Sequence, residues 1–336
     1  MFTLLEDDTE APPGEFNLVR VSRRAMATTF EIAIPQGSHR DAVAAAEDAL
    51  DLIDELEDQM TVFRDESEVS QLNAAAANGP VIVEERLFEL FQRCAVWTRE
   101  TEGAFDIATG ALTKAWGFYR REGRVPAPRE RSEAMAKTGM RHVIFFETGA
   151  MKYRVPGLEL NLGAVGKGYA LDRAAERLRT TWGIRSALLH GGSSSVYAIG
   201  HPPGDPRGWG VRLVFPEQSS LGTIRLRDRG LGTSAATFQF FEYNGRKLGH
   251  LLDPRTGWPA EGTASVSVVA PTAAEADAMS TALFVLGIAG AERLTRTRPH
   301  LGAVILTSPQ RPTSPQRQQG QDPQTFNLAP TSYTPD

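Results

Sequence analysis

The residues best suited to chemistry lie in two neighbouring stretches of the C-terminal half. His250 stands in the turn-like stretch 250–257, and Asp277 and Thr281 follow after a predicted strand. The apolar spacing after Thr272 predicts a helix, on which Asp277 and Thr281 share one face. A carboxylate and a hydroxyl offer the hard oxygen ligands that Mg²⁺ prefers, and a helix start favours a phosphate. The pair therefore indicates a magnesium–phosphate site, although the same spacing is common on the solvated face of an amphipathic helix.

The start of this helix carries its own signal. Thr272 and Glu275 fit a capping box, in which the threonine accepts a free amide and the glutamate reaches back. The residues that recur at helical spacing after them predict a core-facing stripe. These residues are Ala276, Met279, Leu283 and Leu286. In the preceding turn, Asp253 is suited to an Asx hydrogen bond rather than to catalysis.

A glycine-rich turn lies more than a hundred residues earlier. Gly163, Gly166 and Gly168 surround Lys167 and open a predicted helix that runs to about residue 182. Glycines allow the backbone to approach a ligand closely, and the helix start suits an anion. No Ser or Thr follows Lys167, so the turn is not a Walker loop, and the dinucleotide pattern of glycines is also missing. The turn is either an anion site or only a tight strand-to-helix connection.

The composition excludes several classes of protein. The chain has 336 residues, 41% of them hydrophobic and 23% charged, which is typical of a globular protein. Its net charge of −5, without a basic cluster, argues against nucleic acid as a partner. Cys94 is the only cysteine, which excludes an intrachain disulfide and argues against a cysteine-based metal site. The N-terminus does not resemble a signal peptide, and no later stretch looks long enough to span a membrane. We therefore expect a cytoplasmic protein without stable membrane insertion.

The chain alternates between helical and strand patterns without a strict strand–helix rhythm. This mixture predicts an α+β fold, with mixed or antiparallel sheets packed against helices, rather than a doubly wound parallel sheet. Two glycine-containing turns, Gly191-Gly192 and Asn244-Gly245, each predict a strand–turn–strand unit. The predicted helices are 39–59, 84–101, 130–138, 166–182 and the one that follows Thr272. The predicted strands include 28–34, 141–146, 158–162, 209–214, 222–227, 237–243 and 303–306.

The two ends of the chain differ from the part between them. Residues 1–18 are acidic, contain prolines and predict a flexible arm. From residue 308 glutamine and proline dominate, and Thr-Ser-Pro-Gln-Arg occurs twice, so we expect 308–336 to be disordered. The ordered part is expected to be one domain covering 19–307.

Several short motifs, taken together and in order, give the chain a resemblance. They are Met26-Ala-Thr28, Ser67-Glu68 to Asn73, Gly103-Ala-Phe-Asp106, Trp116-Gly-Phe118, Gly166-Lys-Gly-Tyr-Ala170-x-Asp172, Gly191-Gly192, Thr233-Ser234, His250-x-x-Asp-Pro-x-Thr-Gly257 and Ala276-Asp-Ala-x-x-Thr281. In this combination the chain resembles the ApbE family, the FAD:protein FMN transferases, over roughly residues 20–307. The last two motifs are the most distinctive.

The resemblance implies an enzyme and its site. Members of the family use Mg²⁺ to transfer FMN from FAD to a threonine or serine of an acceptor protein, and AMP leaves. By position, the metal ligands would be Asp277, Thr281 and the carbonyl of Ala164, with Ser280 beside them. The residues lining FAD would be Met26, Phe63, Ala104, Phe105, Asp106, Asn161, Lys167 and His250.

The catalytic roles implied are those of Asp277 and His250. His250 is suited to take the proton of the attacking hydroxyl, and it is equally suited to stabilise its own turn. Two other functions stay open: a metal-dependent FAD pyrophosphatase that gives free FMN and AMP, and a non-catalytic FAD-binding protein.

Overall fold

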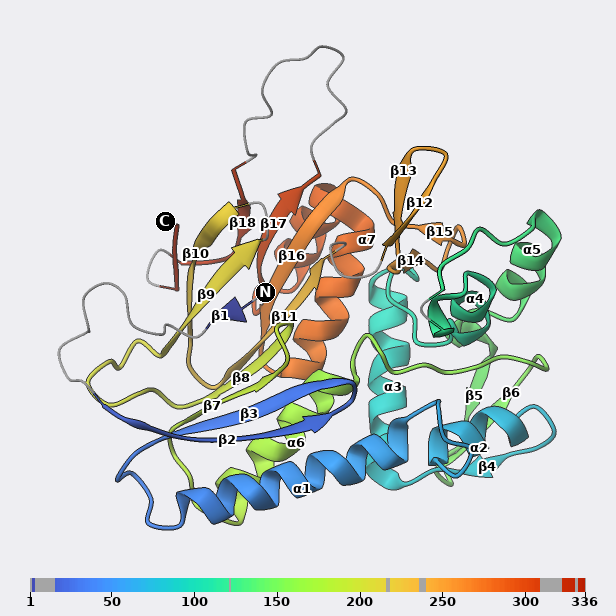
Figure 1. The fold of residues 1–336 in the computed structure, drawn as a ribbon. Coiled ribbons are helices and arrows are strands. Elements are labelled where there is room, and N and C mark those ends of the chain that lie inside the picture. Colours follow the sequence, from blue (N-terminus) through green and yellow to red (C-terminus); the bar gives the residue numbers. More distant parts are fainter. Residues whose placement is uncertain are drawn as a thin grey trace.

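The computed structural model describes residues 2–3, 16–120, 122–215, 218–235, 240–308, 322–329 and 332–335. Figure 1 shows sheets on one side of the molecule, long helices beneath and beside them, and a smaller group of helices and hairpins on the other side. The fold is α+β, as predicted, and every strand pair among the described residues is antiparallel.

An eight-stranded sheet forms the centre of the molecule. Its order is β18 (Gln324–Phe326), β17 (Gly302–Thr307), β16 (Thr263–Ala270), β11 (Arg229–Ala235), β8 (Ser195–Ile199), β7 (Ala187–Gly191), β3 (Thr28–Pro35) and β2 (Leu18–Ala25). All eight residues of β16 are buried, because both faces of the sheet are covered. The predicted strands 28–34 and 303–306 are confirmed as β3 and β17.

Helices cover one face of this sheet and a second sheet covers the other. The helices are α1 (Ala42–Met60), α6 (Gly166–Thr180) and α7 (Ala273–Thr297), with α3 (Glu85–Glu100) alongside. The second sheet has the order β1 (Phe2–Thr3), β9 (Trp209–Phe215), β10 (Gln218–Leu226) and β19 (Tyr333–Thr334). One apolar core thus lies on each face of the central sheet. The larger core lies between this sheet and the helices, and the smaller one lies between the two sheets.

The smaller group lies beside α3. It contains α2 (Glu68–Ala75), α4 (Gly110–Ala115), α5 (Pro128–Ala136), two 3₁₀ turns (Phe118–Arg120 and Met140–His142), the sheet β4 (Val81–Ile82), β6 (Ala150–Tyr153) and β5 (Val143–Phe145), and the hairpins β12 (Phe240–Tyr243)–β13 (Arg246–Gly249) and β14 (Leu252–Asp253)–β15 (Trp258–Pro259). The predicted Asn244-Gly245 turn is confirmed, since both residues have positive φ angles, of 49° and 72°. The strand predicted at 158–162 is wrong, because no strand forms in that segment.

Helix α7 begins as predicted, at the Thr272 cap. The Thr272 hydroxyl accepts the Glu275 amide at 3.2 Å, but the Glu275 carboxylate turns away to Arg298 and His300. Only half of the capping box therefore forms. The predicted apolar stripe is confirmed, with Ala276, Met279 and Leu283 fully buried and Leu286 partly buried.

The expectation that no stretch is long enough to span a membrane is wrong for α7. Its 25 residues meet that test by length and composition. However, 67% of its most apolar 18-residue window is buried inside the molecule, where it packs on β11, β16 and α6. A buried core helix passes the same test, so this finding gives only weak support for a membrane span.

The structure differs from the sequence prediction at both ends of the chain. The predicted N-terminal arm contains β1, which pairs with β9 of the second sheet. Residues 4–15 of the arm lie outside the described residues. Within the predicted disordered tail, β18 extends the central sheet and β19 extends the second sheet. Tyr333 is buried in the second core and its hydroxyl donates to the Leu221 carbonyl. The remainder of the tail, 309–321, 330–331 and 336, lies outside the described residues.

Candidate active site

A single pocket brings together most of the residues singled out in the sequence. It has a volume of about 470 Å³, within the range of small-molecule sites. It lies where the first turns of α6 and α7 meet the ends of β11 and β13. Nine of the predicted site residues line it: Ala104, Asp106, Asn161, Ala164, Lys167, His250, Asp277, Ser280 and Thr281. Other lining residues come from the Ser193-Ser194 turn and from β11.

Glycines allow the elements around the pocket to approach closely. A Cβ atom on Gly168 would lie 2.3 Å from the Ala273 carbonyl oxygen, so only glycine lets α6 meet α7 here. On β11, Cβ atoms at Gly230 and Gly232 would lie 2.4 Å and 2.5 Å from the backbone of α7. The glycine-rich turn and the first turn of α7 are therefore parts of one site, although they are far apart in the sequence.

Asp277 is held by donors from two other elements. Its Oδ2 accepts the Gly168 amide at 2.8 Å, and the Ser195 hydroxyl lies 2.9 Å from both carboxylate oxygens. The residue is only 7% exposed, so the alternative of a solvated helix face is wrong for Asp277. Burial raises its pKa to about 6, against the opposing effects of the Lys167 ammonium, the Ser195 hydroxyl and the Gly168 amide. A cation at this carboxylate would favour its charged form.

Hydroxyl groups line the pocket next to Asp277. Ser280 donates to the Asp277 carbonyl at 3.0 Å, and Ser234 lies 2.9 Å from the Ser280 hydroxyl and 3.3 Å from the Thr281 hydroxyl. They form a connected set of oxygen atoms from α7 and β11, and the same pocket is lined by Ala164.

This set of oxygens fits Mg²⁺ but supplies only one carboxylate. Among the described residues, no group of three His, Cys, Asp or Glu side chains could hold a metal ion. Mg²⁺ is commonly held by one or two carboxylates together with waters and substrate phosphates. The lining of the pocket is therefore compatible with the predicted magnesium site, at which Asp277, the hydroxyl of Thr281 and the carbonyl of Ala164 would hold the ion, with Ser280 beside them. Water and a substrate phosphate would complete the coordination of the ion.

Lys167 and the start of α6 add positive charge to the pocket. Lys167 is partly exposed and lines the pocket, where its positive charge lowers the pKa of Asp277 against the effect of burial. The N-terminus of α6 adds the partial positive charge of the helix dipole. Asn161 shapes the preceding turn, where its side-chain oxygen accepts the Gly163 amide at 2.9 Å. This part of the pocket is suited to an anion.

Asp106 lines the pocket with its carboxylate tied to the backbone. It accepts the Ala108 amide at 2.8 Å and the Met140 amide at 2.9 Å. Burial raises the pKa of this carboxyl, and the two amides oppose the shift. Its predicted hydrogen bond to a nucleotide stays a prediction, and the free lone pairs of the carboxylate are compatible with it.

His250 follows β13 and is one of the residues that line the pocket. Its ring is edge-on to Phe118, with the ring centroids 6.5 Å apart. Both interpretations of His250, as a base and as a turn residue, stay predictions. The Asx hydrogen bond predicted for Asp253 is confirmed, because its side chain accepts the Arg255 amide at 2.9 Å, and the carboxylate also pairs with the Arg255 guanidinium. That Asp253 takes no part in catalysis stays a prediction.

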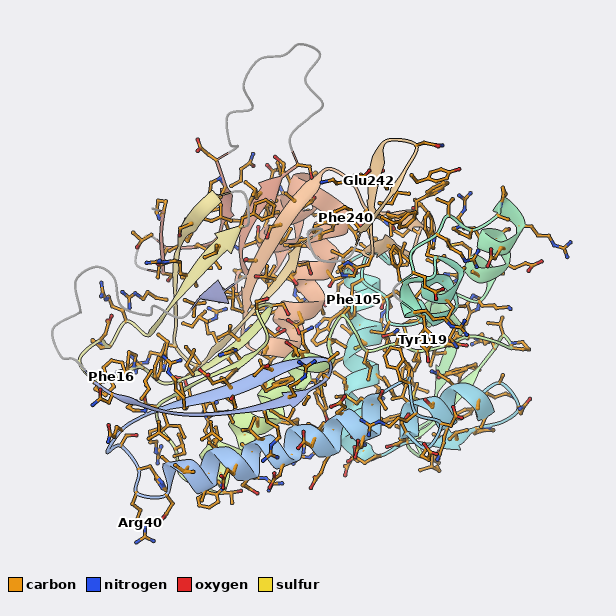
Figure 2. The ribbon with its side chains drawn as sticks, viewed as in Figure 1. Phe16, Arg40, Phe105, Tyr119, Phe240 and Glu242 are labelled. Carbon is orange, nitrogen blue, oxygen red and sulfur yellow. The ribbon has the colours of Figure 1, made fainter. Side chains whose placement is uncertain are left out.

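Three predicted FAD-lining residues do not line this pocket. Met26 stands at the β2–β3 turn with a φ of 49°. Phe105 lies near the centre of the view in Figure 2 and is fully buried. Its ring is edge-on to the Trp97 ring. Phe63 is 68% exposed and stacks on Tyr119, with ring centroids 4.7 Å apart. Their roles toward FAD stay predictions.

Ser195 is one of the site residues that the sequence did not reveal. It lies in a run of three serines after Gly191-Gly192, which predicts only a turn between strands. Its role depends on β8 lying beside α7, which no local pattern encodes. Its complete burial is the structural signal that it holds Asp277 rather than contacting solvent.

Comparisons with known proteins show which family this chain is similar to. The model of the ApbE family matches residues 26–305. An FAD:protein FMN transferase of Treponema pallidum is 33% identical over 280 residues, which cover 78% of this chain and 77% of that protein. One of Klebsiella pneumoniae is 32% identical over 287 residues, covering 82% of this chain and 87% of that protein.

A solved structure is similar over nearly the same extent. The apo crystal structure of the flavinyl transferase ApbE of Pseudomonas stutzeri matches with a TM-score of 0.78 and 26% identity. The match covers 89% of this chain and 94% of that chain. The similarity therefore includes both the central sheet and the smaller group of elements beside α3.

Proposed function

This chain belongs to the ApbE family, and we propose that it is an FAD:protein FMN transferase that uses Mg²⁺, modifies a threonine or serine hydroxyl and releases AMP. The observation that carries the proposal is the contact between Asp277 and the first turn of α6, inside a pocket that also holds Lys167. A buried carboxylate beside a cationic helix start is suited to a metal-bound pyrophosphate.

The reaction breaks the phosphoanhydride bond of FAD and forms a phosphoester with the acceptor. The acceptor hydroxyl oxygen attacks the phosphorus on the FMN side of the pyrophosphate, and the bond from that phosphorus to the bridging oxygen breaks. AMP leaves with the bridging oxygen and its electron pair, and the hydroxyl proton passes to a base. Catalysis of this kind depends on positioning and on stabilising charge.

The residues of the pocket divide these tasks. The Lys167 ammonium and the positive end of the α6 dipole would offset the negative charge of the phosphates. Asp277, Thr281 and the Ala164 carbonyl would hold Mg²⁺, with Ser280 beside them, and the bound ion would neutralise charge on the pyrophosphate and on the leaving oxygen. His250, which lines the pocket, would accept the proton of the hydroxyl. Met26, Phe63, Ala104, Phe105, Asp106 and Asn161 would contact FAD directly or support the residues that do.

A mass and product assay tests the proposal. The protein is mixed with FAD, MgCl₂ and a candidate acceptor domain that carries a Ser/Thr-Gly-Ala-Thr motif. We expect the acceptor to gain the mass of one FMN while AMP appears, and we expect both to be lost with EDTA or in Asp277→Ala. Asp51→Ala, which removes a mostly exposed surface carboxylate, is the matched control and should react like the wild type.

Other outcomes point to the two alternatives. AMP with only free FMN would identify a pyrophosphatase with water as the acceptor. Bound FAD without AMP would identify a flavin-binding protein and refute the assignment of Asp277. The predicted cytoplasmic location is a separate proposal, which cell fractionation tests.

A further inference from the structure

Asp172 lies on α6 and reaches the start of α7. Its Oδ1 accepts the Ala273 amide at 2.7 Å and its Oδ2 accepts the Ala274 amide at 2.9 Å. The first amides of a helix have no partner within the helix. In α7 the Thr272 hydroxyl accepts one of them, from Glu275, and the carboxylate of another helix accepts two more. The start of α7 is therefore fixed from outside as well as from within.

A second hydrogen bond runs from α6 to a carboxylate of α7. Gly168, in the first turn of α6, donates its amide to Asp277 of α7 at 2.8 Å. In each helix the residue that donates its amide stands four positions before the residue that supplies the carboxylate. These residues are Gly168 and Asp172 in α6, and Ala273 and Asp277 in α7. Each helix thus donates first-turn amides to a carboxylate one turn into the other. This reciprocal pair of contacts is named the α6–α7 clamp below.

The α6–α7 clamp fixes where the pocket carboxylate stands. The Gly168 position tolerates no side chain, since a Cβ atom there would meet the Ala273 carbonyl at 2.3 Å. Displacement of α7 by a fraction of an ångström would therefore change the contact between Gly168 and Asp277. Asp172 does not line the pocket, so it acts on the pocket only through the position of α7.

We propose that Asp172 is a positioning residue that, by holding the first amides of α7, places Asp277 against Gly168 and toward the pocket. The ligand-binding part of its test rests on the proposed function, because it uses Mg²⁺ and FAD as probes. The alternative is that Asp172 only stabilises the end of a helix, as any cap does.

Thr272 provides a matched control for that alternative. Thr272→Ala removes a cap from the same helix end but leaves both contacts between α6 and α7. Asp172→Asn keeps one oxygen that accepts a hydrogen bond from one of the two amides. Its NH₂ group then faces the other amide, and because NH₂ is a donor it cannot accept that hydrogen bond. Each substitution is expected to lower Tm by about 2–4 °C, the shift that corresponds to the loss of one cap.

The first measurement needs no ligand. Hydrogen exchange is followed by mass spectrometry in peptides that cover the starts of α6 and α7. Asp172→Asn should speed exchange in both peptides, because loosening α7 also frees the Gly168 amide. Thr272→Ala should speed exchange only at the start of α7. Unchanged exchange at the start of α6 in Asp172→Asn would overturn the proposal.

The second measurement is the binding of FAD at increasing concentrations of MgCl₂, followed by isothermal titration calorimetry. Asp172→Asn should raise the half-saturating Mg²⁺ concentration about tenfold, as loss of a group that orients a metal ligand does, while Thr272→Ala should leave it within about twofold. Equal effects of the two variants would overturn the proposal. Wild-type protein that binds no FAD at any Mg²⁺ concentration would refute the proposed function instead, and the exchange result would still decide the role of Asp172.

A second variant of Asp172 tests the proposal if Asp172→Asn does not fold. Asp172→Glu keeps the carboxyl group but adds one methylene, so it should retain the fold while displacing α7. It should show the exchange pattern and the altered Mg²⁺ dependence expected of Asp172→Asn. A folded Asp172→Glu with wild-type values in both measurements would also overturn the proposal.

Discussion

The backbone amide of Gly168 donates a 2.8 Å hydrogen bond to the carboxylate of Asp277, which lies 109 positions later in the chain. The contact joins the first turn of α6 to the first turn of α7. It places a helix start suited to phosphate beside a carboxylate suited to a metal. Two stretches that are each weak signals in the sequence thereby become one site.

Gly168→Ala tests this contact most directly. The added Cβ atom would lie 2.3 Å from the Ala273 carbonyl oxygen, so α6 and α7 must move apart. We expect a loss of about 1–3 kcal/mol in the free energy of unfolding, as for overpacking in a core, and loss of Mg²⁺-dependent FMN transfer. Urea unfolding and the mass assay measure the two effects. Gly79→Ala, where a Cβ atom meets nothing within 4 Å, should change neither, and a fully active Gly168→Ala would contradict the close approach.

The sequence predicted the elements that depend on local patterns. Helical periodicity located α7, the glycines located the start of α6, and Asn244-Gly245 located a hairpin. It also predicted that Asp277 and Thr281 would face the same side, where both now line one pocket. These features follow from spacing along a single element, which a sequence shows directly.

Contacts between distant elements could not be predicted in the same way. The Glu275 carboxylate leaves the capping box because Arg298 and His300 lie close to it in the fold. Phe105 matches a family motif but is fully buried in the core, since its neighbours are set by α3. The composition of the tail predicted disorder, yet Tyr333 fills a place in the second core that only tertiary packing creates.

Ser195→Ala is expected to weaken the metal site more than the fold. Ser195 contacts both oxygens of Asp277 at 2.9 Å, so its loss frees the carboxylate to turn and removes a donor. We expect FMN transfer to fall about 10–100-fold at a fixed Mg²⁺ concentration, with recovery at higher Mg²⁺. The loss of stability should be about 1 kcal/mol. Transfer is measured as a function of Mg²⁺ concentration.

Ser186→Ala is the control for this prediction. Its hydroxyl donates to the His201 carbonyl at 2.6 Å, and it does not line the pocket. It should lose comparable stability without changing the Mg²⁺ dependence. If both variants change the Mg²⁺ dependence equally, Ser195 has no specific role at the carboxylate.

Asp205 is expected to make the stability of the second sheet depend on pH. Hydrogen bonds from the Arg207 guanidinium lower its pKa to about 2, helped by the Arg207 amide and the Arg225 charge. The folded chain then binds fewer protons than the unfolded chain between about pH 4 and pH 2, so stability rises with pH in that window. From the size of the pKa shift, ionised Asp205 contributes about 2 kcal/mol to the free energy of unfolding. This contribution is complete above about pH 4 and is lost as the pH falls toward 2.

Asp205→Asn should therefore be about 2 kcal/mol less stable than the wild type at pH 7, with the difference shrinking as the pH falls below 4. Urea unfolding at pH 7, 4 and 2.5 measures it. Glu133→Gln breaks an exposed pair with Arg129 and should cost less than about 0.5 kcal/mol at every pH. A difference that stays constant with pH would show that the Asp205 charge is not responsible.

His250→Gln separates the two interpretations of this histidine. If His250 accepts the proton of the acceptor hydroxyl, its loss should lower the rate of FMN transfer about 10²–10⁴-fold while FAD still binds. The rate of the wild type should fall at acid pH as one group becomes protonated, and that dependence should vanish in the variant. If His250 only stabilises its turn, Tm and FAD binding should fall together and the pH dependence should remain. Phe118→Leu, which removes the ring edge-on to His250 and keeps the imidazole, is the matched variant: it should reduce the rate far less than His250→Gln and preserve the pH dependence.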